Sequence, residues 1–260
     1  MAIASPGPSR IHSRAGSFSS STSSSTPLPS FEGLAPSRPP TTIEKEETRV
    51  IVPGLPGGRD VRLKVDAGPG CGGIAWRSGE VMSRYLAHRH ATFPEKLRGK
   101  KIIELGSGTG LVGIATAMLE PTSQVWVTDQ EMLLDLMQAN SELNLDDLDG
   151  ENNVHVAELS WGEPIHETIP VEEASIILAA DCVYFEPAFP LLVTTLCDLA
   201  PVGKDIEILF CWKKRRKADK RFFAMLRKHF DQEMVLDDRE GEKELYSREG
   251  ITLMRLKRRI

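Results

Sequence analysis

The amino-acid sequence predicts an α/β fold with a seven-stranded, mostly parallel sheet, helices on both faces, a final antiparallel strand and a short N-terminal β-hairpin. Three observations support this. Short apolar runs alternate with segments of helical apolar spacing from about residue 100 onward, which is the pattern of a parallel sheet with crossover helices. The first run, Lys101–Leu105, passes directly into a glycine-rich turn. The last two predicted strands are joined by Asp237–Gly250, which is too short for a long crossover helix.

The chain divides into a tail over residues 1–45 and a globular domain over residues 46–260. The first 40 residues contain 12 Ser and 7 Pro, and this composition cannot bury enough apolar surface to offset the entropy lost on ordering. We therefore predict a disordered tail. Its arginines and scarce acidic residues are also typical of a mitochondrial transit peptide, but the amphipathic apolar face of such a peptide is missing.

The elements of the domain follow in order. Two alternating stretches, Arg49–Pro53 and Asp60–Val65, bracket a Gly/Pro-rich turn and predict the hairpin. Residues Gly79–His90 have the apolar spacing of a helix. The parallel strands are predicted at Lys101–Leu105, Gln124–Thr128, Val154–Ala157, Ala174–Ala180 and Ile206–Trp212, and the helices at Leu111–Leu119, Glu131–Asn144, Ala188–Leu199 and Lys220–Phe230. The closing strands, Glu233–Leu236 and Ile251–Leu256, are predicted to be antiparallel.

Composition excludes several classes of protein. Hydrophobic residues make up 40%, slightly below the norm for globular domains, and charged residues make up 27%, which is near it. No apolar run approaches the length of a transmembrane helix. The net charge of −5 argues against nucleic acid as the main partner, because that binding depends on basic surfaces. The cysteines at 71, 182, 197 and 211 have no metal-ligand spacing and are too sparse for a disulfide framework. We therefore expect no metal site. Reduced thiols are typical of a cytosolic or nuclear protein, and of these two locations we expect the cytoplasm.

The densest chemical signal is the segment Glu104–Gly110, which lies between a predicted strand and a predicted helix. The glycines at Gly106, Gly108 and Gly110, with Ser107 between the first two, let a ligand approach the backbone. The helix that follows offers free N–H groups at its N-terminus. The spacing is GxGxG, which differs from both the GxGxxG of dinucleotide-binding folds and the phosphate-binding P-loop.

An acidic residue, Asp129, ends the next predicted strand, where a carboxylate can accept hydrogen bonds from ribose hydroxyls. Enzymes that bind dinucleotides and enzymes that bind S-adenosylmethionine share this device. Glu104 discriminates between them, because a carboxylate there repels a pyrophosphate and attracts the amine and sulfonium of S-adenosylmethionine. The residues therefore favour S-adenosylmethionine as cofactor and methyl transfer over hydride transfer. A glycine-rich turn beside an exposed Asp, with no ligand, is the competing interpretation.

Two further segments carry a resemblance to a known family. Leu159–Gly162 reads Leu-Ser-Trp-Gly, and Ala180–Tyr184 reads Ala-Asp-Cys-Val-Tyr. With Glu104–Gly110 and Asp129, they resemble class I seven-β-strand S-adenosylmethionine-dependent methyltransferases, and in particular the Trp-Gly and Asp-x-x-Tyr signatures of the methyltransferase-16 group of protein lysine methyltransferases. The resemblance covers about residues 70–258 and implies a Rossmann-like fold and an enzyme that methylates a protein lysine. The chain is most similar to the fungal elongation factor methyltransferases, which implies translation elongation factor 1-alpha as its partner.

The resemblance also implies a role for each site residue. Asp181 and Tyr184 would be catalytic: Asp181 holds the incoming ammonium, and Tyr184 walls the lysine channel with its ring or donates a hydrogen bond. Trp76 and Trp161 would stack on the adenine or close the pocket, and Ala180 would line it. The competing interpretations are that Asp181 caps the following helix, that Tyr184 is a core residue, and that both tryptophans are core residues.

The strongest positive cluster is Lys213–Lys217, continued by Lys220 and Arg221. We interpret it as a solvated loop and helix start, with substrate docking and nuclear import as alternatives. Two alternative functions also remain: a methyltransferase of the same fold acting on another protein or a small molecule, and a non-enzymatic cofactor-binding adaptor. We expect a monomer without membrane or direct nucleic-acid partners.

Overall fold

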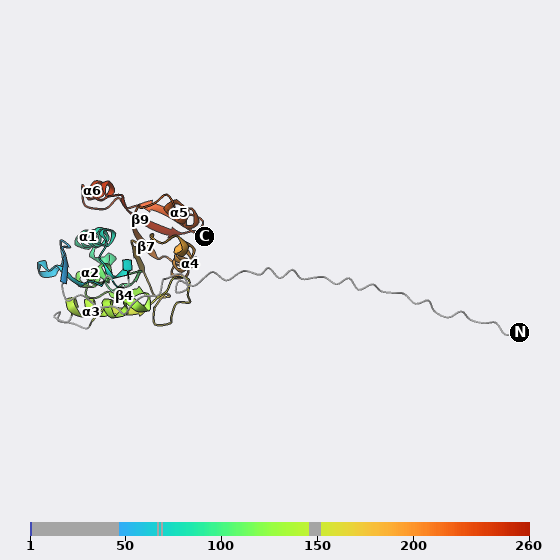
Figure 1. Ribbon diagram of the computed structural model, residues 1–260, viewed down its shortest axis with the longest axis horizontal. Coiled ribbons are helices and arrows are strands. Elements are labelled where there is room, and N and C mark those ends of the chain that lie inside the picture. The colour runs from blue at the N-terminus through green and yellow to red at the C-terminus, as the bar shows by residue number, and fades with distance from the viewer. Residues whose placement is uncertain (2–46, 67, 69, 146–151) are drawn as a thin grey trace.

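A seven-stranded sheet forms the centre of the computed structural model, which describes Met1 and residues 47–66, 68, 70–145 and 152–260 (Figure 1). Apart from Met1, the predicted tail lies outside the described residues. The strands are β3 (Lys101–Leu105), β4 (Gln124–Asp129), β5 (Val154–Glu158), β6 (Ile176–Ala180), β7 (Glu207–Lys213), β8 (Phe230–Met234) and β9 (Ile251–Arg258). Their order is β5-β4-β3-β6-β7-β9-β8, and every pair is parallel except the two that β9 makes. This confirms the predicted sheet.

Helices cover both faces of the sheet. They are α1 (Arg77–Thr92), α2 (Leu111–Leu119), α3 (Leu134–Leu145), α4 (Phe189–Leu199), α5 (Asp219–Leu226) and α6 (Glu242–Arg248). Ile102 and Leu178 of the central strands are buried with α1 and α2, whereas their neighbours Ile103 and Ile177 are buried with α4 and α5. Figure 1 shows the two groups of helices on opposite sides of β7. Because both faces are covered, the central strand β6 is apolar throughout.

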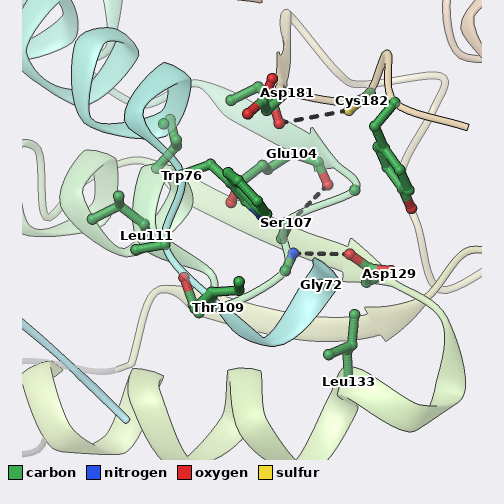
Figure 2. A pocket seen from close by; sticks show the side chains of 18 of the residues that line it. Gly72, Trp76, Glu104, Ser107, Thr109, Leu111, Asp129, Leu133, Asp181 and Cys182 are labelled. Carbon is green, nitrogen blue, oxygen red and sulfur yellow. Dashed lines mark hydrogen bonds between the residues drawn. The ribbon is translucent and has the colours of Figure 1, made fainter. Parts of the chain in front are cut away.

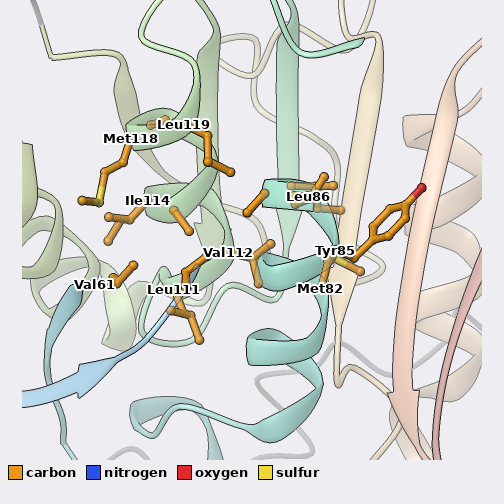
Figure 3. Packing of buried hydrophobic residues seen from close by; sticks show 14 of the residues in the cluster. Val61, Met82, Tyr85, Leu86, Leu111, Val112, Ile114, Met118 and Leu119 are labelled. Atoms are coloured by element: carbon orange, nitrogen blue, oxygen red, sulfur yellow. The ribbon is translucent and has the colours of Figure 1, made fainter. Parts of the chain in front are cut away.

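One core cluster joins the hairpin to the sheet (Figure 3). Tyr85 of α1 points away from α2, toward Arg255 of β9. Met82 and Leu86 of α1 are buried against α2, whose Val112 faces them. Val61 from the hairpin is fully buried on the same helix. The helix that carries the glycine-rich turn is therefore packed on several sides, which holds the turn in a defined place.

The predicted hairpin is present as a separate two-stranded antiparallel sheet of β1 (Glu47–Val50) and β2 (Val61–Lys64). Two asparagines of α3 bind the outer edge of β2. Asn140 accepts a hydrogen bond from the nitrogen of Lys64 and donates one to its oxygen, at 2.7 and 3.1 Å. Asn144 makes the same pair with Arg62, at 2.9 and 2.7 Å. These amides fix the hairpin to the sheet domain.

The predicted helix Lys220–Phe230 was wrong in its last turn. The helix α5 ends at Leu226, and Phe230 instead begins β8, where it pairs with Arg258 of β9. Phe230 is fully buried, and an apolar residue at this position also fits the spacing of a helix. The spacing could not show that its partner is a strand. The predicted strand Glu233–Leu236 is correspondingly displaced, and Leu236 is 80% exposed. The short helix α6 fits within the connection that the sequence predicted.

Within the described residues, none of the helices has the length and apolarity needed to cross a bilayer. The same residues contain no cluster of three or more side chains suited to holding a metal ion.

Candidate active site

The site lies where the strand order reverses. The strands β3 and β6 are neighbours, but the chain leaves β3 for β4 on the other side, and such a switch point opens a crevice at the carboxyl ends of the strands. A cavity of about 490 Å³ lies there. All predicted site residues except Gly110 line it, namely Trp76, Glu104, Gly106, Ser107, Gly108, Asp129, Trp161, Ala180, Asp181 and Tyr184. Gly110 instead precedes α2 with a φ of 80° and packs against Ile114.

Two glycines of the turn allow close approach of other parts of the protein. Gly106 has a φ of 65°, and a Cβ there would lie 3.0 Å from the ring of Trp161. Gly108 has a φ of 59°, and a Cβ would lie 2.6 Å from the carbonyl oxygen of Gly72. Both positions therefore require glycine for conformation and for space. The segment around Gly72, which connects the hairpin to α1, closes directly over the turn.

The carboxylate of Asp129 is built into the cavity wall. Its two oxygens accept hydrogen bonds of 2.8 Å from the backbone nitrogens of Gly108 and Gln130. Burial raises the pKa of Asp129 to about 6. An ionised carboxylate offers about four acceptor sites, so the two backbone bonds leave capacity for ligand hydroxyls.

Glu104 is a buried carboxylate between the two ends of the cavity. One oxygen accepts a 2.8 Å hydrogen bond from the nitrogen of Gly113 in the first turn of α2. Burial raises the pKa of Glu104 to about 8, in spite of this bond. Figure 2 shows Asp129 and Leu133 on one side of Glu104 and Asp181 on the other. A cationic ligand beside Glu104 would favour its ionised form.

The carboxylate of Asp181 forms a bidentate ion pair with Arg215. The two nitrogen–oxygen distances are 2.6 and 2.5 Å, and the Asp181 side chain is only 4% exposed. Asp181 also has a φ of 63°, which is uncommon outside glycine and is found at functional sites. Its side chain makes no cap, because neither α4 nor the short turn Glu186–Ala188 before it has a side-chain cap bond. The capping interpretation was therefore wrong.

Aromatic rings form the walls around this pair. Trp76 is 39% exposed, and the guanidinium carbon of Arg215 lies 5.3 Å from its ring centroid. Trp161 is buried and lies 6.2 Å from the ring of Tyr184, at 60° between the planes. Trp76 is thus a wall of the cavity, and Trp161 is both a lining and a core residue.

The interpretation of the cluster Lys213–Lys217 as a solvated loop was wrong for Arg215, whereas Arg216 is exposed as predicted but also contacts the site. Arg215 binds Asp181, and Arg216 donates a hydrogen bond of 2.9 Å to the carbonyl oxygen of Tyr184. Both line the cavity. Composition alone could not reveal these pairs, but the position after the fifth parallel strand indicated the ligand edge of the sheet.

Sequence reasoning also missed several apolar and small lining residues. They are Ile74, Leu111, Val112, Met132, Leu133, Leu159, Cys182 and Phe185. Leu111, Cys182 and Phe185 adjoin a predicted site residue in the chain, and for these three that adjacency was the available signal. Leu133 and Asp129 lie at one end of the cavity and give it an apolar wall with an acceptor group, which fits a nucleoside, while Glu104 fits a cation (Figure 2). The described residues are therefore suited to S-adenosylmethionine.

Comparison with known proteins gives an independent result. A family model described as lysine methyltransferase matches residues 57–229. Protein-lysine N-methyltransferase EFM6 of Saccharomyces cerevisiae is 39% identical, over 62% of this chain and 72% of that protein. Protein N-lysine methyltransferase METTL21A of Danio rerio is 35% identical, over 68% of this chain and 77% of that protein. EEF1A lysine methyltransferase 3 of Mus musculus is 32% identical, over 66% and 69%.

Proposed function

Because the chain belongs to the lysine methyltransferase family, we propose that its cavity is where the methyl group of S-adenosylmethionine passes to the ε-amine of a protein lysine. The protein is an S-adenosylmethionine-dependent protein-lysine methyltransferase. One observation carries the assignment of the site: Asp129, Glu104 and Asp181 line a single cavity at the switch point of the sheet. A hydroxyl-bearing ribose, a cationic amino acid part and a cationic lysine each need an acidic partner.

At the cofactor end, Asp129 would accept the ribose hydroxyls and Glu104 would attract the amino group. Ala180 and the turn from Gly106 to Gly108 would pass close to the cofactor without bulky side chains. When bound, S-adenosylmethionine supplies a methyl carbon whose bond to sulfur breaks as a nitrogen lone pair bonds to it, leaving a neutral thioether. The protein has only to hold and align the two partners, and alignment supplies most of the catalysis.

At the lysine end, Asp181 would hold the ammonium and Tyr184 would wall the channel. A lysine amine has an ordinary pKa near 10.4, so it must release a proton before its lone pair can attack. Asp181 can receive that proton or relay it to water. Its burial and its unusual backbone conformation support this role.

We propose translation elongation factor 1-alpha as the protein substrate. Support comes from the similarity to the fungal elongation factor methyltransferases and from the mouse relative, whose name specifies lysine methylation of EEF1A. The other relatives are named only as protein-lysine methyltransferases. The free thiols of Cys182, Cys197 and Cys211 are in keeping with a cytoplasmic enzyme, and we propose that it acts as a monomer.

The test is transfer of label from S-adenosylmethionine. The purified protein is incubated with labelled cofactor and a lysate of its source organism from which its own gene has been deleted, and labelled proteins are identified by mass spectrometry. We expect one dominant protein labelled on lysine, and the same labelling with purified elongation factor 1-alpha. Label confined to small molecules or RNA would overturn the proposed function. Label on a different protein would overturn only the choice of substrate.

A further inference from the structure

We propose that Arg215 occupies the place of the substrate lysine at Asp181, and that an incoming ammonium must displace it before methyl transfer. This proposal rests on the proposed function, because it names the group that the lysine replaces. It assigns to Arg215 the role of a competing cation, which differs from the substrate docking that the cluster Lys213–Lys217 left open.

The contacts of Arg215 are those that a substrate ammonium would need. Its guanidinium donates to both oxygens of Asp181, at 2.6 and 2.5 Å, and its carbon lies 5.3 Å from the ring centroid of Trp76. A carboxylate and an aromatic face are the two partners that a lysine ammonium seeks. Arg215, Asp181, Trp76 and Tyr184 all line the same cavity. The lysine end of the site therefore already contains a cation.

The backbone below Arg215 is held independently of its side chain. The buried carboxylate of Asp219 accepts hydrogen bonds from the nitrogens of Arg215 and Arg216, at 2.8 and 3.0 Å. Displacement therefore requires rotation of the Arg215 side chain, which is 22% exposed and borders solvent, and the loss of its 3.2 Å hydrogen bond to the carbonyl oxygen of Lys213. The loop after β7 can stay in place while the guanidinium leaves.

The burial of Asp181 favours direct exchange of Arg215 for the substrate lysine over departure of Arg215 before the substrate arrives. Asp181 is only 4% exposed, and a buried charge that loses its partner is strongly destabilised. Arg215 should therefore stay on Asp181 until another cation can replace it. A protonated lysine can do so, whereas a neutral hydroxyl or amide cannot compensate the carboxylate. The exchange thus favours a lysine side chain over neutral nucleophiles and keeps the site closed when no substrate is bound.

The first test places a lysine where the guanidinium lies. An Arg215→Lys variant is incubated with S-adenosylmethionine alone, and methylation is mapped by mass spectrometry. We expect the variant to methylate itself at position 215, and the native lysines of the same loop, Lys214 and Lys217, to remain unmodified. An unmodified position 215, in a variant that still binds cofactor, would overturn the proposal. If the wild-type protein labels no protein lysine in the lysate experiment, the proposed function itself fails.

The second test removes the competitor. In Arg215→Gln we expect the KM for the protein substrate to fall by at least about tenfold, because the substrate ammonium no longer has to displace a competing cation and each ~1.4 kcal/mol of competition removed is a factor of ten, with cofactor affinity unchanged. Because this readout does not require methylation at position 215, it remains informative if Arg215→Lys folds poorly. An unchanged KM, or a fall in kcat with an alkaline shift of the pH profile, would show that Arg215 stays in the site during the reaction and would overturn the proposal.

Discussion

One carboxylate oxygen of Asp129 accepts a 2.8 Å hydrogen bond from the backbone nitrogen of Gly108, which ties the end of β4 to the turn after β3. The other oxygen binds the nitrogen of Gln130. The same carboxylate therefore orders the floor of the cavity and faces the ligand space. This dual use makes Asp129 the most direct point at which to test cofactor binding.

For Asp129→Ala we expect cofactor binding to weaken by about 2–5 kcal/mol, since each of two ribose hydrogen bonds to a charged group contributes roughly 1.5–3 kcal/mol with partial replacement by water. Isothermal titration with S-adenosylmethionine measures the loss. Asp135→Ala, which removes an exposed carboxylate from α3, is the control and should bind normally. Unchanged affinity in a folded Asp129→Ala variant would mean that the ribose is held elsewhere.

Cofactor affinity should rise between pH 6 and 8. Burial raises the pKa of Asp129 to about 6 and that of Glu104 to about 8, so both carboxyls bind protons in this range. A cationic cofactor favours their ionised forms, and the complex therefore holds fewer protons than the free protein. Titration at several pH values checks this, and Glu104→Gln should flatten the dependence. An affinity independent of pH in the wild-type protein would contradict it.

The same raised pKa values have the opposite consequence for folding. The ordinary pKa of Glu104 is 4.5, so between about pH 4.5 and 8 the unfolded chain has lost a proton that the folded protein keeps. The free energy of unfolding of the cofactor-free protein should therefore fall as pH rises through this window. Urea unfolding measures this free energy at pH 5 and pH 8. A higher free energy of unfolding at pH 8 than at pH 5 would contradict the prediction.

For Asp181→Asn we expect methyl transfer to fall by at least about 100-fold, the lower range for loss of a positioned acid–base or electrostatic group. Cofactor affinity should be retained, because Asp181 lies at the lysine end. Tyr184→Phe should lose less if the ring face matters more than the hydroxyl. Single-turnover transfer at saturating cofactor is the assay. Near-normal turnover of Asp181→Asn would remove Asp181 from the proposed mechanism.

Gly108→Ala should destabilise the protein and weaken cofactor binding. Its φ of 59° strains any residue with a Cβ, and the new methyl would lie 2.6 Å from the oxygen of Gly72. Gly58→Ala is a matched control, because Gly58 has a φ of 64° but no atom within 4 Å of an added Cβ. The control should lose about 1 kcal/mol from backbone strain alone. Equal loss in thermal unfolding would show that the contact with Gly72 is unimportant.

Removal of residues 1–40 should leave methyl transfer intact, because the Ser/Pro-rich composition of this segment is unsuited to packing on the domain. The family match, over residues 57–229, lies entirely outside it. A chain that begins at Thr41 should fold and bind cofactor normally. Loss of protein methylation with normal cofactor binding would instead assign substrate recognition to the tail.

The buried central elements could be predicted closely from the sequence. The strand Lys101–Leu105 and the helix Leu111–Leu119 have their predicted bounds, because each has a buried apolar run that is bounded by glycine or polar residues. Phe230 was misassigned because apolar spacing reports burial and does not identify the partner. Its pairing with Arg258 joins residues distant in the chain, and a local pattern cannot show such a contact.

The site was predictable where its residues end strands. Glu104, Asp129 and Asp181 each follow an apolar run, and the carboxyl ends of parallel strands meet at one edge. Arg215 was missed because it lies among four other cations, and its sequence neighbours Lys214 and Arg216 give no sign of which one turns inward. Only the fold brings it to Asp181, which lies 34 residues away in the chain.

The amides of Asn140 and Asn144 have a consequence for self-association. Each amide donates a hydrogen bond to one residue of β2 and accepts one from it. The two side chains of α3 thus make the bonds that the backbone of a neighbouring strand would make. An open strand edge is a template for pairing with another chain and hence for aggregation. On the β2 side that template is already occupied by side chains. The hairpin can thus support the wall of the cavity without offering this edge for intermolecular β-sheet growth.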